Sequence, residues 1–249
     1  MIETESNNTL PTFKPLQLGL TGSIGMGKST VDNHLRVLGI PVFDADAEVH
    51  KLYRAGGAAI EPIRQLFPDV ITEDGVCRKL LSEKILQNPS TLKEIEAIVH
   101  PLVAKKRIEF FEDAVLKEEF LIVHDIPLLF ETNQASNFDY VLVVSADESV
   151  QRQRVLQRPG MTIEKFESIL KRQTPNSEKC ERADFVIRTD FDGYEESRAQ
   201  VSRTIEAIIL SHPARWDRWK CRNGRDYFTN NIIFIAFLYM YIWGELLGL

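Results

Sequence analysis

One eight-residue motif constrains this chain more than any other feature of its sequence. Residues 22–29 read Gly-Ser-Ile-Gly-Met-Gly-Lys-Ser and match the pattern G-x-x-x-x-G-K-[ST]. An apolar run, 16–20, precedes the motif. The residues after it place Val31, Leu35 and Leu38 on one face of a helix. This order of strand, glycine loop and helix predicts a phosphate-binding loop in an α/β domain; the alternative is a flexible glycine turn without a ligand.

The chemistry of such a loop follows from its residue types. Glycines let the backbone wrap a phosphate with its N–H groups pointing inward, and the helix that follows adds its positive dipole end. Lys28 would reach the β- and γ-phosphates of ATP, and the Ser29 hydroxyl would hold Mg²⁺. The residues expected to bind the nucleotide here are Gly22, Gly25, Met26, Gly27, Lys28, Ser29 and Thr30. No N-K-x-D run for guanine is present, which leaves a kinase or an ATPase.

The remaining hydrophobic pattern predicts an α/β fold with a five-stranded parallel sheet. Short apolar runs alternate with amphipathic ones between residue 16 and about residue 210, as in successive βα units. The expected strands are 16–20, 40–43, 120–123, 140–144 and 185–187. Between residues 51 and 119 the pattern is mainly helical, which indicates an inserted helical segment.

Charge, cysteine usage and the first residues narrow the class of protein. The formal net charge of −6 disfavours a nucleic-acid-binding protein, which normally carries a basic excess. The three cysteines show no CxxC spacing, so neither a zinc site nor a disulfide framework is expected, and a reducing compartment such as the cytoplasm fits best. Residues 1–15 lack the apolar stretch of a signal peptide and are expected to form a disordered leader.

Three aspartates come at the ends of predicted strands, at the edge where ligands bind in open parallel sheets. Asp44 is our candidate for the group that orients an acceptor hydroxyl and takes its proton. The alternative is that Asp44 is a solvated turn residue and Asp46 caps the helix that begins near Ala47. Asp125 could support Mg²⁺ through water, or simply end its strand in a turn.

A basic segment follows the fourth predicted strand. Arg154 and Arg158 are four residues apart, which on a helix places both on one face, where their guanidinium groups could neutralise a transferred phosphoryl group. Pro159-Gly160 would then provide the hinge of a lid. The alternative is an ordinary solvated helix face. His100 is a candidate substrate contact, although a histidine at a helix entry or in the core would explain it equally.

Several separated stretches together resemble the dephospho-coenzyme A kinase family. The matching stretches, in order, are Leu20-Thr21-Gly22 with Gly27-Lys28-Ser29-Thr30, Asp44-Ala45-Asp46, His100-Pro101-Leu102, Ile126-Pro127-Leu128-Leu129-Phe130-Glu131 and Arg182-Ala183-Asp184-Phe185-Val186-Ile187. The glycine loop marks only the superfamily of P-loop kinases. The D-A-D and P-L-L-F-E stretches are far more specific.

The resemblance implies transfer of the γ-phosphate of ATP to the 3′-hydroxyl of dephospho-coenzyme A, the last step of coenzyme A biosynthesis. By matched position, Asp44 would be the base, with Lys28 and Arg154 also catalytic. Arg158 would bind the nucleotide, and Gln173 and Lys179 would lie near the lid or the base. Asp46, His100 and Glu131 would bind the acceptor.

The sequence also predicts how the chain is organised into domains. A P-loop kinase domain is expected over 16–210, with an acceptor-binding insertion at about 47–119 and a helical lid at about 148–175. Two departures from the family pattern stand out. Ser23 replaces a frequent glycine, and Arg188-Thr189 replaces the usual Asp-Asn, so contacts at that strand end are not assigned. The sequence does not determine the oligomeric state.

The C-terminal segment 211–249 is unusual. A basic stretch with Trp216 and Trp219 precedes an apolar run, 232–249, that is interrupted only by Glu245 among charged residues. This pattern is typical of membrane attachment by a tail or an interfacial helix, although a core or oligomer-contact helix is the alternative. The functional alternatives are a kinase for another small acceptor, such as a nucleoside or nucleoside monophosphate, and a non-catalytic, membrane-associated ATP-dependent switch.

Overall fold

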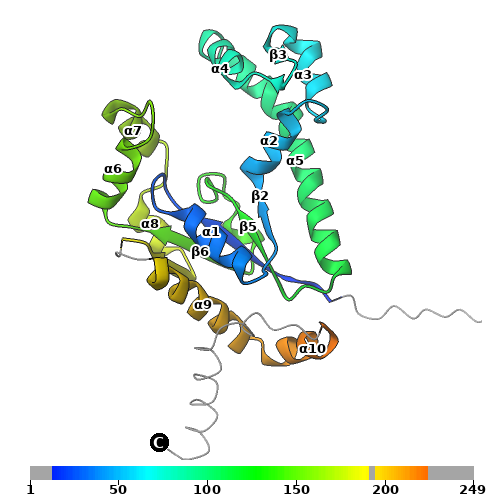
Figure 1. The fold of residues 1–249 in the computed structure, drawn as a ribbon, viewed down its shortest axis with the longest axis vertical. Helices are drawn as coiled ribbons and strands as arrows, with labels where there is room; N and C mark the ends of the chain where they lie inside the picture. The colour runs from blue at the N-terminus through cyan, green and yellow to red at the C-terminus, as the bar shows by residue number, and fades with distance from the viewer. Residues whose placement is uncertain (1–12, 191–193, 224–249) are drawn as a thin grey trace, which may run out of the picture. The chain divides into compact units, whose positions relative to one another are not determined.

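The computed structural model describes residues 13–190 and 194–223, which divide into two compact units (Figure 1). The first, here called the core unit, comprises the described residues up to Val42 and from Lys117 onward. The second, the inserted unit, is Phe43–Leu116. The inserted unit begins four residues and ends three residues before the insertion proposed from the sequence, about 47–119.

A five-stranded sheet has the strand order β2-β5-β1-β6-β7. Its strands are β1 (Leu16–Thr21), β2 (Val42–Asp44), β5 (Leu121–Asp125), β6 (Tyr140–Ser145) and β7 (Phe185–Arg188). The pairs β1–β5, β1–β6 and β6–β7 are parallel. Leu18 and Leu20 of the central strand are completely buried, as expected for a strand covered on both faces. The predicted α/β fold with a five-stranded parallel sheet is confirmed.

Several helices of the core unit pack directly on strands of this sheet (Figure 1). The helices described in this unit are α1 (Lys28–Val37), α6 (Glu148–Leu156), α7 (Ile163–Leu170), α8 (Asn176–Glu181), α9 (Tyr194–Leu210) and α10 (Pro213–Asn223), with a 3₁₀ turn at Ala135–Asn137. Helix α1 packs against α9 and buries Val31 and Leu35 of the predicted stripe, whereas Leu38 follows the end of the helix and is partly buried. Gly39 follows with a φ of 80°, the left-handed conformation expected of a residue that ends a helix.

The inserted unit has its own small hydrophobic core. Its elements are α2 (Ala45–Tyr53), α3 (Ile60–Leu66), a 3₁₀ turn (Pro68–Val70), β3 (Ile71–Thr72), β4 (Gly75–Val76), α4 (Arg78–Gln87) and α5 (Ser90–Leu116). Helices α2, α3 and α4 all contact the long helix α5, and Ile63 and Val70 are completely buried. The antiparallel pair β3–β4 was not predicted, because strands of two residues are too short to show an alternating pattern.

Helix α10 corrects part of the reading of the C-terminal segment. Trp219 is completely buried and Trp216 nearly so. Their rings stack with centroids 4.9 Å apart, and the rings of Trp216 and Phe120 are nearly perpendicular with centroids 5.1 Å apart. These tryptophans therefore belong to the hydrophobic core and not to an aromatic membrane belt, so the core unit continues past residue 210.

The predicted apolar tail, 232–249, lies outside the described residues, and its membrane attachment stays a prediction. None of the helices within the described ranges is long and apolar enough to cross a membrane. At the other end of the chain, Phe13 is buried in the core under the guanidinium of Arg215, which lies 5.1 Å from the ring centroid. Residues 13–15 therefore belong to the folded unit and not to the leader that we expected over 1–15.

Candidate active site

The glycine loop between β1 and α1 needs two of its glycines for steric and conformational reasons. Gly25 and Gly27 have φ values of 79° and 87°, a left-handed conformation that favours glycine. A Cβ atom on Gly25 would lie 2.4 Å from Val155 Cγ2, and one on Gly27 would lie 2.7 Å from Thr189 Oγ1. The loop is thus pressed against α6 on one side and against the end of β7 on the other.

Thr189 connects the loop to one of the predicted arginines. Its hydroxyl donates to the Met26 carbonyl oxygen at 2.7 Å and accepts from Arg154 Nη1 at 2.9 Å. Arg154 Nη2 also donates to the Thr189 carbonyl oxygen at 2.5 Å. Met26 is itself buried, and its sulfur accepts a hydrogen bond from the Ala146 N–H. Arg154 is therefore fixed beside the loop through Thr189.

Lys28, the first residue of α1, forms an ion pair with Asp125 at the end of β5. Asp125 pairs in register with Leu20 of β1, so it lies beside the strand that leads into the loop. The carboxylate is only 6% exposed. Ser29 is exposed in the first turn of α1, and the Thr30 N–H donates to the Gly27 carbonyl oxygen. The structure thus brings together the lysine and the carboxylate that sequence reasoning treated separately.

Arg158 does not share a helix face with Arg154. Helix α6 ends at Leu156, so Arg158 is an exposed residue of the turn that follows the helix. The expectation of two guanidinium groups four residues apart on one face is therefore wrong in this structure. The helix does not continue to Arg158 because the Arg158 N–H donates to the Val155 carbonyl oxygen three residues earlier. This bond tightens the chain into a turn before Pro159-Gly160.

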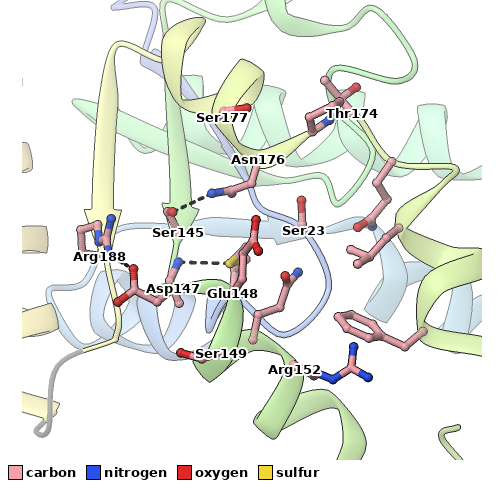
Figure 2. A pocket seen from close by; sticks show the side chains of 17 residues that line it. Ser23, Ser145, Asp147, Glu148, Ser149, Arg152, Thr174, Asn176, Ser177 and Arg188 are labelled. Atoms are coloured by element: carbon pink, nitrogen blue, oxygen red, sulfur yellow. Dashed lines mark hydrogen bonds and ion pairs between the residues drawn. The ribbon is translucent and has the colours of Figure 1, made fainter. Parts of the chain in front are cut away.

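A cavity of about 780 Å³ lies beside the loop within the core unit (Figure 2). Its wall includes Ser23 and Met26 of the loop, Gln151 and Arg152 of α6, and Gln173 after α7. Figure 2 shows Asn176 reaching from α8 to Ser145 at the end of β6, where its amide nitrogen donates to the hydroxyl at 2.9 Å. The volume is within the range of pockets for nucleotide-sized ligands.

Glu131, a predicted acceptor contact, is engaged by other protein groups. Its Oε1 accepts from the Thr174 N–H at 2.8 Å and forms an ion pair with Lys179 Nζ at 2.8 Å. The Lys179 side chain is completely buried. Burial opposes ionisation of Glu131, but the ion pair with Lys179 and the hydrogen bonds from the backbone outweigh it, so the pKa of the Glu131 carboxyl is held below its ordinary value.

This lowered pKa predicts a loss of stability in acid. A carboxyl whose folded pKa is depressed stabilises the protein fully above its unfolded pKa, here 4.5, and the stabilisation disappears as the pH falls through the folded value. Glu131→Gln is expected to lower the free energy of unfolding by about 2 kcal/mol at neutral pH. The difference from the wild type should shrink as the pH falls below 4.5.

Urea unfolding from neutral pH down to about pH 3 tests this expectation. The control is Glu178→Gln, which removes the exposed partner of Arg182 on α8 and should change stability by less than about 0.5 kcal/mol. A difference between the wild type and Glu131→Gln that stays constant with pH would contradict the assignment.

The other three predicted residues belong to the inserted unit and are described within it. Asp44 ends β2 and caps α2, because its Oδ1 accepts from the Ala47 N–H at 2.9 Å. The capping role considered for Asp46 thus belongs to Asp44, and Asp46 is an exposed residue of the first turn of α2. His100 is exposed in the interior of α5, so it lies neither at a helix entry nor in the core.

Sequence reasoning missed three residues that contact the loop or Glu131. These are Gln151, Thr174 and Thr189. Thr189 had a usable signal, because it comes two residues after the predicted strand 185–187, at the edge where the loop lies. For Gln151 and Thr174 the sequence holds no signal, since each acts through a contact with a residue far away in the chain.

A parallel sheet with this strand order, a glycine loop directly after its central strand and a lysine at the start of the next helix are the features of a P-loop nucleotide-binding protein, the class that includes the P-loop kinases. The sequence profile described as dephospho-CoA kinase matches residues 16–193, more than half of the chain. The chain belongs to the dephospho-CoA kinase family.

Individual relatives agree with this assignment. The chain is 47% identical over 200 residues to the dephospho-CoA kinase of Novosphingobium aromaticivorans, covering 80% of this chain and 98% of the relative. It is 48% identical over 192 residues to that of Ruegeria pomeroyi, covering 77% and 95%. Among solved structures, dephospho-CoA kinase from Campylobacter jejuni superposes with a TM-score of 0.57 at 27% identity, covering 77% of this chain and 96% of that one. The protein TT1252 from Thermus thermophilus gives a TM-score of 0.67 at 32% identity, with coverage of 78% and 98%.

Proposed function

We propose that this chain transfers the γ-phosphate of ATP to the 3′-hydroxyl of dephospho-coenzyme A and releases coenzyme A and ADP, the last step of coenzyme A biosynthesis. The observation that carries the proposal is the loop of the core unit, with left-handed Gly25 and Gly27 and with Lys28 paired to Asp125, in a chain of the dephospho-CoA kinase family. Family membership supports ATP as the phosphate donor.

The nucleotide phosphates would bind to the glycine loop. We assign it to Gly22, Gly25, Met26, Gly27, Lys28, Ser29 and Thr30. Lys28 would exchange its partner Asp125 for the β- and γ-phosphates and so offset the charge that develops on the transferred group. Arg154, fixed through Thr189, would add a second positive charge, and Arg158 would approach the nucleotide from the turn after α6.

The oxygen ligands near Lys28 fit a magnesium ion. Mg²⁺ prefers one or two protein oxygens together with phosphate oxygens and water. Ser29 offers an exposed hydroxyl, and Asp125 offers a carboxylate held at a strand end. When bound there, the ion would neutralise charge on the β- and γ-phosphates.

On the acceptor side, Asp44 is our candidate for the group that takes the proton of the attacking hydroxyl. Asp46 and His100 are both exposed and available to contact the acceptor. For Glu131 we propose an indirect role, because its contacts with Thr174 and Lys179 order the chain after α7.

The deciding experiment measures ADP release by the full chain with ATP, Mg²⁺ and separate acceptors. The panel is dephospho-coenzyme A, adenosine, AMP and CMP. Turnover confined to dephospho-coenzyme A is the expected result. Turnover on another acceptor would keep the kinase class and overturn the substrate, and binding of ATP without any turnover would favour a non-catalytic switch. For location we propose the cytoplasm, in agreement with the unpaired cysteines Cys77, Cys180 and Cys221.

A further inference from the structure

Two glutamine side chains hold the same residue of the glycine loop. Gln151 Nε2 donates to the Ile24 carbonyl oxygen at 2.8 Å. Gln173 Oε1 accepts from the Ile24 N–H at 3.2 Å. Both backbone polar groups of Ile24 are thus bound by side-chain amides. The Gln151 side chain is almost completely buried and contributes this bond from the interior.

The backbone dictates which atom each glutamine presents. A carbonyl oxygen can only accept, so Gln151 must turn its NH₂ group toward Ile24. An N–H can only donate, so Gln173 must turn its carbonyl oxygen. The two amides therefore have opposite orientations, and a carboxylate in their place would keep the bond made by Gln173 and lose the bond made by Gln151.

The glutamines come from opposite ends of the segment that we expect to form the lid, about 148–175. Gln151 lies in the first turn of α6, and Gln173 follows the end of α7. Helix α6 also packs directly on the loop, since a Cβ atom on Gly25 would lie 3.1 Å from the Gln151 carbonyl oxygen. Both glutamines line the cavity beside the loop. The two ends of this segment therefore meet at one loop residue.

We propose that Gln151 and Gln173 are positioning residues that couple the segment 148–175 to the shape of the phosphate-binding loop through Ile24. Ile24 directly precedes the left-handed residues of the loop, whose glycines lose more backbone entropy on ordering than any other residue type. Holding Ile24 at both of its polar groups orders the loop before a phosphate arrives, which strengthens phosphate binding. The kinetic part of this inference rests on the proposed function.

The first test is amide hydrogen exchange of Ile24 by NMR in the protein without nucleotide, which requires no catalytic activity. Gln173→Leu removes the acceptor of the Ile24 N–H and is expected to speed its exchange roughly three- to tenfold, the effect of losing one hydrogen bond. Gln151→Leu frees only the Ile24 carbonyl oxygen, so it should speed exchange of this amide by a smaller factor, through the coupling alone. Gln173→Glu should keep slow exchange, whereas Gln151→Glu should not. The matched control is Gln153→Leu, an exposed glutamine of the same helix, which should leave exchange unchanged.

The second test is a double-mutant cycle on the KM for ATP and on kcat. Each Leu variant should raise the KM for ATP roughly three- to tenfold with a smaller change in kcat, and the double variant should raise it by less than the product of the two. Independent, multiplicative effects would overturn the coupling through Ile24, as would equal behaviour of the two Glu variants in hydrogen exchange. An inactive wild type with protected Ile24 would overturn the proposed function and leave the contact assignment standing.

Discussion

Replacing Asp44 with asparagine is expected to lower kcat for dephospho-coenzyme A about 10²- to 10⁴-fold while leaving the Kd for ATP nearly unchanged. The amide has the shape of the carboxylate but cannot take the proton of the attacking hydroxyl. The choice of asparagine matters because Asp44 also caps α2 through Ala47, and an asparagine oxygen can accept the same hydrogen bond. The variant therefore separates catalysis from folding.

Steady-state kinetics and ATP titration calorimetry check this prediction. The control is Asp46→Asn, which removes an exposed carboxylate from the first turn of the same helix and should change kcat much less. Thermal unfolding should place both variants close to the wild type. Unchanged turnover in Asp44→Asn would remove this residue from the mechanism.

The second large effect is expected at the loop. Lys28→Ala should lower kcat/KM about 10²- to 10³-fold, the magnitude found when one preorganised donor to a developing charge is removed. The KM for ATP should rise and kcat should fall, because the ammonium group would contact the phosphates before and during transfer. In this respect the variant differs from Asp44→Asn, in which ATP binding is kept.

The same substitution also removes the partner of the buried Asp125, so stability must be measured separately. The comparison is with Lys105→Ala, which removes an exposed positive charge from α5 and should leave kcat/KM within about twofold. Wild-type kinetics in a folded Lys28→Ala protein would refute the assignment of the loop as the nucleotide site.

The parts of the fold that were predicted correctly are those with a local signal. The five strands of the sheet appear as short apolar runs, and the stripe of Val31 and Leu35 repeats at helical spacing. The tryptophans of α10 show the limit of such reasoning. Beside basic residues they look like a membrane-interface pattern, and only their packing on Phe120 reveals a core helix.

In the candidate site, too, the residues that were predicted correctly are those with a local signal in the sequence. The loop motif identified Gly25, Gly27 and Lys28 because the motif consists of residues that are adjacent in the chain. Arg158 was misplaced because a period of 3.6 residues does not say where a helix ends, and here α6 ends at Leu156. Glu131 and Lys179 were both named from the resemblance, but neither their ion pair nor the bond from Thr174 to Glu131 was predicted.

The sequence by itself determined that this chain has a phosphate-binding loop, a parallel α/β sheet and the motifs of a dephospho-CoA kinase. Each of these features has its signal in short stretches of adjacent residues. Only the tertiary structure decided how the loop is held. Thr189 reaches Met26 across 163 residues of chain, and Gln173 reaches Ile24 across 149. Contacts over such distances depend on which strands become neighbours in the sheet. That strand order cannot be predicted from a local pattern of residues.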